Sequence, residues 1–170
     1  QPMLPSAASR GTSRPVTLRQ ADALALPFAD ATFDAVVCQF GVMFFPDRPR
    51  AYGEARRVLK PGGTFLFNVW DRIEENELAD TVTAALATFF PADPPRFLAR
   101  TPHGYHDSAA IRADLGRGGF IAAPAITTVT ARSRAASHRD PAVAYCQGTP
   151  LRTEIEARDA SSLVAATAAA

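Results

Sequence analysis

Two short apolar runs, rich in β-branched and aromatic residues, flank a helical pattern in the first half of the chain. The runs are Phe33–Gln39 (FDAVVCQ) and 64–70 (TFLFNVW), and turn-forming residues bound both of them. Between them, residues 48–59 place apolar side chains at helical spacing after an N-cap at Asp47, and the sequence KPGG at 60–63 ends the helix. This pattern predicts a strand–helix–strand unit whose strands are parallel and buried on both faces.

Apolar periodicity predicts further helices in the second half of the chain. Residues 76–90 form an amphipathic stripe, and a proline cluster follows it. Ser108 is predicted to cap a short helix, and another helix begins at Asp140 or Pro141 and continues to Tyr145. A glycine or proline is predicted to end each of these helices.

Two stretches outside the central unit alternate apolar and polar residues. These are 16–20 (VTLRQ) and 126–131, and both are predicted to be strands. Residues 96–106 contain Pro102 and Gly104 and are predicted to form a loop.

The bulk composition is that of an ordinary globular domain. The chain has 170 residues, of which 47% are hydrophobic and 21% charged, and its net charge is +1. Such a charge gives no reason to expect nucleic acid or an anionic membrane as a partner, so we expect a small-molecule partner. Cys38 and Cys146 are predicted to be free thiols. The sequence has no apolar run of membrane-spanning length and its first residues lack a signal-peptide core, so we expect a cytoplasmic protein.

The carboxyl ends of the predicted strands are where a ligand is expected. In open parallel sheets ligands bind beyond these ends, which directs attention to residues 38–41 and to the neighbouring Asp22. The Asp22 carboxylate could accept a hydrogen bond from an exocyclic amine while the backbone of Ala23 pairs with a ring nitrogen, and together they would read an adenine edge. The alternative is that Asp22 only forms a turn.

Three motifs in fixed order carry a family resemblance. They are D-A-x-x-L-P-F at 22–28, F-D-x-V at 33–36 and L-K-P-G-G at 59–63. Each motif is weak alone, but together, in this order and spacing, they are specific. Over 16–70 the chain resembles class I S-adenosylmethionine-dependent methyltransferases, most closely the branch that includes the ubiquinone and menaquinone biosynthesis methyltransferases.

The resemblance implies a Rossmann-like α/β fold with S-adenosylmethionine as cofactor. It implies that Asp22 and Ala23 hold the adenine, and that Gln39 and Phe40 contact the cofactor at the strand tip. The reaction would be in-line transfer of a methyl group from the sulfonium to a small-molecule acceptor. Because the sulfonium is already activated, the protein needs mainly to position the reactants and exclude water, so no catalytic residue is assigned. No metal site is expected.

The resemblance also implies an incomplete fold. No G-x-G-x-G turn that follows a strand and opens a helix is found in the sequence. The expected architecture is a partial doubly wound sheet, truncated at both ends, that lacks the glycine-loop strand–helix unit and the last strand. Residues 1–170 would form one incomplete methyltransferase domain, with 71–106 as a substrate-side insertion. The alternative is a degenerate relative that no longer binds cofactor and serves as an interaction or dimerisation module, and unpaired sheet edges make a homodimer possible.

Aromatic residues and histidines near the predicted site leave two interpretations open. Phe44 and Phe45 either pack the helix onto the sheet or line the substrate opening. His103, Tyr105 and His106 could act as a general base or a substrate clamp, but a histidine in a loop of this composition more often lies on the surface.

Charged residues of the strand–helix–strand unit are given structural roles. Glu54, Arg56 and Arg57 are predicted to form a solvated helix face. Asp34 is predicted to bond local backbone at the entry to its strand, at the end opposite to the ligand.

Overall fold

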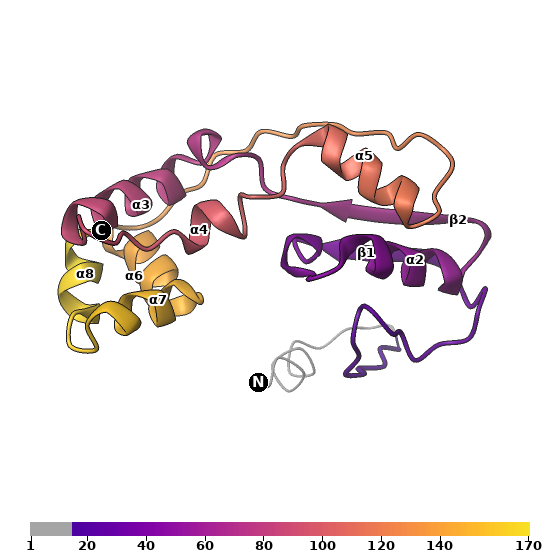
Figure 1. Cartoon of the computed structure of the whole chain (residues 1–170), viewed down its shortest axis with the longest axis horizontal. Coiled ribbons are helices and arrows are strands. Elements are labelled where there is room, and N and C mark those ends of the chain that lie inside the picture. The colour runs from indigo at the N-terminus through magenta and orange to yellow at the C-terminus, as the bar shows by residue number, and fades with distance from the viewer. Residues whose placement is uncertain (1–14) are drawn as a thin grey trace.

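Two parallel strands joined by a helix form the first half of the structure, a computed structural model that describes residues 15–170. Strand β1 (Phe33–Gln39) leads through the 3-10 turn η1 (Val42–Phe44) into α2 (Arg48–Val58), and β2 (Leu59–Asn68) follows directly. The two strands pair in parallel (Figure 1). The predicted strand–helix–strand unit is therefore confirmed, and the described residues form a mixed α/β structure with a small parallel sheet.

Local sequence signals set the bounds of α2 nearly as predicted. The Asp47 carboxylate accepts a hydrogen bond from the backbone N–H of Arg50 at 3.0 Å, which satisfies one of the free donors of the first turn. The helix ends at Val58, where the chain turns extended. Residues 60–63 do not form a separate turn, because they are already part of β2, with Gly62 at a φ of 79°.

The remaining elements are helical and fall into two groups (Figure 1). Helix α5 packs on α2 beside the sheet, and the others gather at the far end of the molecule. In chain order, the helical elements after β2 are η2 (Ile73–Glu75), α3 (Glu77–Phe89), α4 (Phe97–Arg100), α5 (Ser108–Arg117), α6 (Arg139–Gly148), α7 (Leu151–Arg158) and α8 (Leu163–Ala169). Within residues 15–170, no helix has the length and apolar character needed to cross a membrane.

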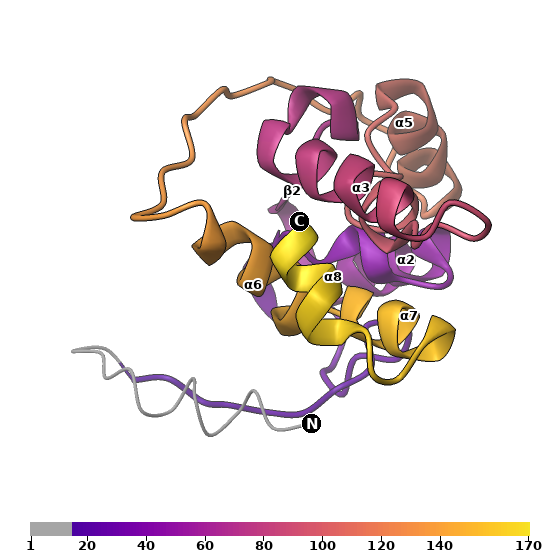
Figure 2. The same ribbon diagram turned by 90° about the vertical axis from the view of Figure 1, so that its left-hand side faces the viewer.

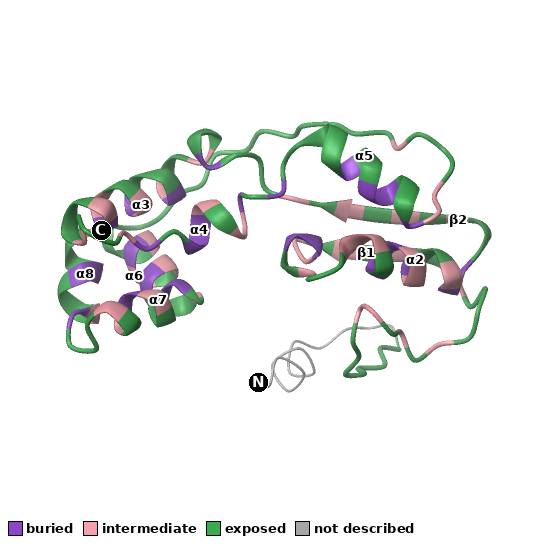
Figure 3. Ribbon diagram, in the orientation of Figure 1, coloured by how far each residue is buried: buried purple, intermediate pink, exposed green. Residues whose placement is uncertain are grey.

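One hydrophobic core lies between the sheet, α2 and α5. Tyr52 of α2 is fully buried, and its ring lies 5.6 Å from that of Phe65 and 5.4 Å from that of Phe67, both on β2. Ile111 and Leu115 of α5 complete this core. Figure 3 shows the buried side of α5 turned toward β2.

The opposite face of the sheet is open, which corrects the expectation of strands buried on both faces. Val37 of β1 is 65% exposed and Leu66 of β2 is 60% exposed. Alternate residues of a strand point to opposite faces, and every described helix that touches the sheet lies on the Phe65 and Phe67 side. A run of apolar residues in the sequence therefore predicts a strand suited to burial, but it does not show whether another element covers each face of that strand.

A second core holds the helices of the far end together. Val82 and Leu86 of α3 pack with Leu98 of α4, Cys146 of α6 and Ile155 of α7, and all five are buried. The amphipathic helix predicted at 76–90 is confirmed as α3. Cys38 and Cys146 are both free thiols, as predicted.

Neither of the strands predicted outside the central unit forms. Residues 16–20 are irregular, with Val16 61% exposed, and 126–131 are irregular, with Val129 83% exposed. A strand needs a neighbour for its backbone hydrogen bonds, and no described segment pairs with either stretch. The second stretch belongs to the extended connection between α5 and α6 (Figure 2).

Two predicted helix starts shift by one or two residues, and one predicted loop contains a short helix. The N-cap of α5 is Asp107 rather than Ser108, because the Asp107 carboxylate accepts from the backbone N–H of Ala109 at 2.7 Å. The predicted loop 96–106 contains the short helix α4. Helix α6 begins at Arg139, one or two residues before the predicted start at Asp140 or Pro141.

A buried chain of hydroxyl and carboxylate groups links α2 to α5. The Tyr52 hydroxyl donates to the Tyr105 oxygen at 3.2 Å, and the Tyr105 hydroxyl donates to the Asp114 carboxylate at 2.8 Å. Arg117 pairs with the same carboxylate, and the Arg48 guanidinium lies 4.1 Å from the centroid of the Tyr105 ring. Burial raises the pKa of the Tyr52 hydroxyl to about 12 and also raises the pKa of the Tyr105 hydroxyl, so both hydroxyls are protonated near neutral pH.

We predict that Tyr105→Phe lowers the free energy of unfolding by about 1–2 kcal/mol, because a buried acceptor and a buried donor both lose their partner. Tyr52→Phe should cost less, about 0.5–1 kcal/mol, since the Tyr105–Asp114 bond survives. Urea unfolding followed by circular dichroism measures both values. Equal losses in the free energy of unfolding for the two variants would contradict a hydrogen-bond chain in which Tyr105 lies between Tyr52 and Asp114.

Candidate functional site

The carboxyl ends of β1 and β2 meet at one edge of the sheet. Gln39 and Asn68 are register partners at the last position of the two strands. The next residue, Phe40, has a φ of 49°, a conformation that is costly for a residue with a side chain. Its backbone N–H donates to the Asn68 side-chain oxygen at 2.9 Å, so a side chain of β2 stabilises the turn that ends β1.

An aromatic stack lies directly beside this edge. The ring of Phe40 lies 4.2 Å from that of Trp70 at an interplanar angle of 16°, and the His103 ring follows at 6.1 Å from Trp70. Trp70 is 43% exposed. The strained turn of Phe40 therefore places an accessible indole next to the strand tip.

Close packing at the strand tip disfavours a side chain at Gly41. A Cβ atom at this position would lie 2.7 Å from the Cys38 Sγ atom. Burial raises the pKa of the Cys38 thiol, so the sulfur at this edge is a neutral packing group near neutral pH.

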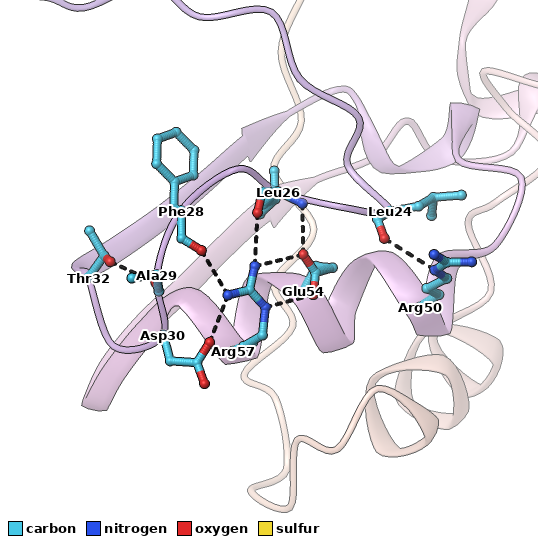
Figure 4. Close-up of polar contacts among 9 residues, drawn as sticks. All are labelled: Leu24, Leu26, Phe28, Ala29, Asp30, Thr32, Arg50, Glu54 and Arg57. Atoms are coloured by element: carbon cyan, nitrogen blue, oxygen red, sulfur yellow. Dashed lines mark hydrogen bonds and ion pairs between the residues drawn. The ribbon is translucent and has the colours of Figure 1, made fainter.

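The loop before β1 is held against α2 by Arg57, which corrects the expectation of a solvated helix face (Figure 4). The Arg57 guanidinium donates two bonds to the Glu54 carboxylate, both at 2.8 Å, and bonds the carbonyl oxygens of Leu26 at 2.9 Å and Phe28 at 2.8 Å. It also pairs with Asp30 at 2.7 Å. The i, i+3 pair on α2 thus fixes the path of a loop about 30 residues earlier in the chain.

Glu54 is the second half of this contact. Its carboxylate accepts from the backbone N–H of Leu26 at 2.7 Å as well as from Arg57. The Arg57 hydrogen bond, against the opposing effect of burial, holds the pKa of Glu54 at about 2, well below its usual value. Arg56 on the same helix is exposed, so the predicted solvated role fits this one residue.

The loop runs along α2 from the carboxyl end of the sheet to its amino end. Leu24 lies at the carboxyl end, since its carbonyl accepts from Arg50 in the first turn of α2 at 3.2 Å, while Asp30 lies beside the last turn (Figure 4). Asp22 and Ala23 directly precede Leu24 and so lie at the carboxyl end too. Asp22 forms a turn there, because its Oδ1 accepts from the Leu24 N–H at 2.9 Å.

The predicted site residues share an end of the unit but do not share a cavity. A shallow depression of about 650 Å³ is lined by residues of the loop after Ala23 and of α2, and a cavity of about 750 Å³ lies on the Trp70 side. Neither of these two includes Asp22 or Gln39 in its wall. Asp34 lies at the opposite end of β1, as predicted, but it pairs with Lys60 at 2.8 Å, and this pair lowers the pKa of Asp34.

The 750 Å³ cavity opens between the strand tip and the helical end of the molecule. Its wall combines aromatic, aliphatic and charged side chains from β2's exit, α3, α4, α6 and the 131–134 segment; they include Phe44, Trp70, Glu75, Glu77, Phe97, Leu98, His103, Arg132, Arg134 and Tyr145. A volume of this size suits a small organic ligand. Each of the two interpretations of the phenylalanines holds for one residue. Phe45 packs against the core beside the sheet, whereas Phe44, which is 51% exposed, lines the cavity.

His103 is buried, with 5% of its surface exposed, so the expectation of a surface histidine is wrong for this residue. Its Nδ1 lies 2.9 Å from the carbonyl oxygen of Asp71, and its own carbonyl accepts from His106 Nδ1 at 2.8 Å. Burial lowers the pKa of the His103 imidazole. Tyr105 is also buried, within the tyrosine chain described above, while His106 is exposed.

Comparison with known proteins assigns the part of the chain that carries this edge. Residues 1–67 match the family described as methyltransferase domain. This part of the chain is therefore similar to a methyltransferase domain. It contains β1, α2 and nearly all of β2, together with the loop that Arg57 holds.

Individual relatives of the methyltransferase segment agree with this assignment. Demethylmenaquinone methyltransferase of Thermus thermophilus is 50% identical over 64 residues, which cover 36% of this chain and 29% of the relative. Ubiquinone/menaquinone biosynthesis C-methyltransferase UbiE of Cellvibrio japonicus is 31% identical over 122 residues, 66% of this chain and 49% of the relative. Protein Rv1405c of Mycobacterium tuberculosis is 43% identical over 70 residues, 40% of this chain and 26% of the relative.

These matches confirm the predicted resemblance to methyltransferases of the ubiquinone and menaquinone branch. The chain spans at most about half the length of these relatives, with 49% for the C-methyltransferase. That alignment is longer than the 67 residues of the family match, so the similarity continues into the helical end of the molecule.

We predict that Gly41→Ala destabilises the protein by about 1–3 kcal/mol, because the new methyl group overlaps the Cys38 sulfur. The backbone of Gly41 has a φ of −111°, which alanine tolerates, so the effect isolates the contact. The same substitution in a Cys38→Ala background should cost much less. A cost that is unchanged in that background, measured by urea unfolding, would contradict the contact.

We also predict a pH-dependent contribution of Glu54 to stability. The pKa of Glu54 is lowered from 4.5 to about 2 on folding, so its stabilising effect is complete above pH 4.5 and is lost as the pH falls toward 2. The unfolding temperatures of the wild type and of Glu54→Gln should therefore differ most above pH 4.5 and converge below it. Glu156→Gln, which removes a more exposed helical pair with Arg152, is the matched control. A Glu54→Gln difference that stays constant from pH 6 to pH 2 would refute this role.

Proposed function

We propose that the chain is part of an S-adenosylmethionine-dependent methyltransferase that methylates a small-molecule acceptor. The observation that carries the proposal is the juxtaposition at the sheet edge: the strand tips that the methyltransferase segment supplies lie next to a 750 Å³ cavity that shares Trp70 and Phe44 with them. Carboxyl ends of parallel strands are where doubly wound α/β proteins bind their ligands. The names of the relatives, demethylmenaquinone methyltransferase among them, agree with a small acceptor.

The donor is proposed to bind at the outer side of the strand tip. Gln39 is exposed at the end of β1 and offers an amide that can both donate and accept. The Asp22 carboxylate uses Oδ1 for its own turn, and no other described residue bonds Oδ2, so this oxygen can accept from an adenine amine. Ala23 and Phe40 complete the proposed donor site by their backbone and ring, respectively. These residue types fit the nucleoside part of S-adenosylmethionine.

The bound donor supplies an activated methyl group, which needs only displacement by a nucleophile in line with its carbon–sulfur bond. The protein itself positions the two reactants and keeps water away from them. The Phe40–Trp70 stack joins the strand tip, where Phe40 lies, to the cavity, which Trp70 lines together with residues of the helical end. Holding two reactants in line in this way accounts for a large part of the rate of such a reaction.

The acceptor is proposed to lie in the cavity, on the side formed by residues 71–106. This segment contributes α3, α4 and the loop that carries His103, and all three reach the cavity wall. The wall combines apolar and aromatic side chains with charged groups from Glu75, Glu77 and the 131–134 segment. A flat, partly polar small molecule matches this lining.

Calorimetry with S-adenosylmethionine and with its demethylated product tests the proposal. We predict binding in the micromolar range for both and a loss of at least tenfold in affinity for Gln39→Ala. Gln147→Ala, which removes an exposed glutamine on α6, is the matched control and should bind as the wild type does.

The absence of binding at millimolar ligand would contradict the proposal for this chain. It would favour the second candidate, a module for interaction or dimerisation. One observation supports that candidate: the apolar face of the sheet around Val37 and Leu66 is open to contact by another chain.

A further inference from the structure

The connection between α5 and α6, residues 121–138, makes almost no backbone hydrogen bonds. Every residue of this connection except Pro124 is exposed. Between residues 121 and 136, no backbone N–H donates to any residue of the described chain, and the one carbonyl that accepts is that of Pro124, from Arg112 at 3.0 Å. A connection of this length without secondary structure is uncommon in a compact domain and often serves a function.

Residues 126–131 of the connection have the composition of a strand. Five of these six residues are β-branched (ITTVT), a side-chain type that suits a pleated sheet. Ile126 is 42% exposed and Val129 is 83% exposed, so neither apolar side chain is covered by a core. An extended segment with unpaired backbone groups is suited to join the edge of a sheet.

The chain itself has a free sheet edge of matching length. β2 pairs with β1 through residues 64–68, and no described segment pairs with the other edge of β2. The connection begins beside this strand, because the Phe120 ring lies 5.6 Å from the Phe65 ring. It ends beside the exit of β2, where residues 131–134 and Trp70 line the same 750 Å³ cavity. The connection and β2 therefore run in the same direction (Figure 1).

We propose that the connection closes on the free edge of β2, with residues 127–131 as a third parallel strand beside 64–68, and that it thereby acts as a lid on the 750 Å³ cavity. The structure shows the open form. The inference does not rest on the proposed function, since it holds for any ligand of the cavity. The strand order β1, β2, connection gives both crossovers the same hand, because α2 and α5 lie on the same face of the sheet.

The exposed side chains fix the register of the closed form. Val129 would lie beside Leu66, which is the register partner of Val37. These three apolar side chains, which are 83%, 60% and 65% exposed in the open form, would then form one row across the open face of the sheet. A slip of one residue would turn Val129 to the opposite face.

Charge favours the parallel direction over the antiparallel one. In the proposed register Arg134 lies beside Asp71, and neither forms an ion pair within residues 15–170. Antiparallel addition would instead bring Arg132 and Arg134 toward Lys60, at the start of β2. Closure within one chain also avoids the loss of translational freedom that pairing with a second copy requires.

Disulfide trapping tests the closed form and its register. Adjacent strands lie about 4.8 Å apart, which is within the Cα separation of a disulfide. We expect Thr64→Cys/Thr127→Cys and Leu66→Cys/Val129→Cys to form an intramolecular disulfide roughly tenfold faster than Leu66→Cys/Thr128→Cys, whose second thiol points to the other face. All five positions are exposed in the open form, so the substitutions leave its cores intact.

The native thiols do not obscure this result. Burial raises the pKa of both Cys38 and Cys146, so both react slowly near neutral pH. Mass spectrometry of peptides distinguishes disulfides within a chain from those between chains. Equal rates for the two Leu66→Cys pairs, or no disulfide in either in-register pair, would overturn the proposal. A disulfide that joins two chains would overturn it as well and would assign the edge to a second copy.

Trp70, the only tryptophan of the chain, reports whether closure covers the cavity. We expect acrylamide to quench its fluorescence roughly twofold less in the oxidised Thr64→Cys/Thr127→Cys variant than in the reduced one, because a closed lid limits access to the cavity. The wild type, treated in the same way, should show no change. A disulfide that forms but leaves the quenching of Trp70 unchanged would overturn the role as a lid.

Discussion

The parallel pairing of β1 with β2 is the constraint on which the rest of the structure depends. Two parallel strands need a crossover between them, and α2 provides it on the face that Phe65 and Phe67 occupy. The crossover places both carboxyl ends at one edge, with the N-terminus of α2 beside them. Everything assigned to the site follows from that edge: the turn at Phe40, the stack on Trp70 and the loop that carries Asp22.

The contacts at the edge divide into those that hold the chain and those that remain open for a ligand. Arg57 donates to Glu54, to Asp30 and to two carbonyls of the loop before β1, so it fixes the path of that loop and has no donor left for a ligand. Within residues 15–170, the side chain of Gln39 and the second oxygen of Asp22 form no internal bond, so both remain open for a ligand at the carboxyl end of the sheet.

The sequence predicted the central unit because its signals are local. Periodicity, the cap at Asp47 and the glycines after Val58 all act within a few residues, and they determine a strand–helix–strand unit without reference to the rest of the chain. The strands predicted at 16–20 and 126–131 failed because a strand depends on a partner, which alternation of residue types does not reveal. The expectation that β1 and β2 are buried on both faces failed for the same reason.

The site could be predicted only in part. The strand tip was located through the motifs at 22–28, 33–36 and 59–63, and Cys38 was correctly expected to be a free thiol. The role of Arg57 was missed, since an Arg three residues after a Glu reads as a surface pair and its contacts with Leu26 and Phe28 are distant in sequence. The burial of His103 was missed as well, because it comes from the packing of Trp70 and the Asp71 carbonyl against a loop whose composition is typical of the surface.

The central claim is that the methyl donor binds at the edge where β1 and β2 end. Mapping of backbone amide shifts on titration with S-adenosylhomocysteine tests it most directly. The account predicts that the largest shifts fall at residues 38–41, 68–70 and 22–23, with α7 and α8 unaffected. Shifts confined to the helical end of the molecule, or none at saturating ligand, would contradict it.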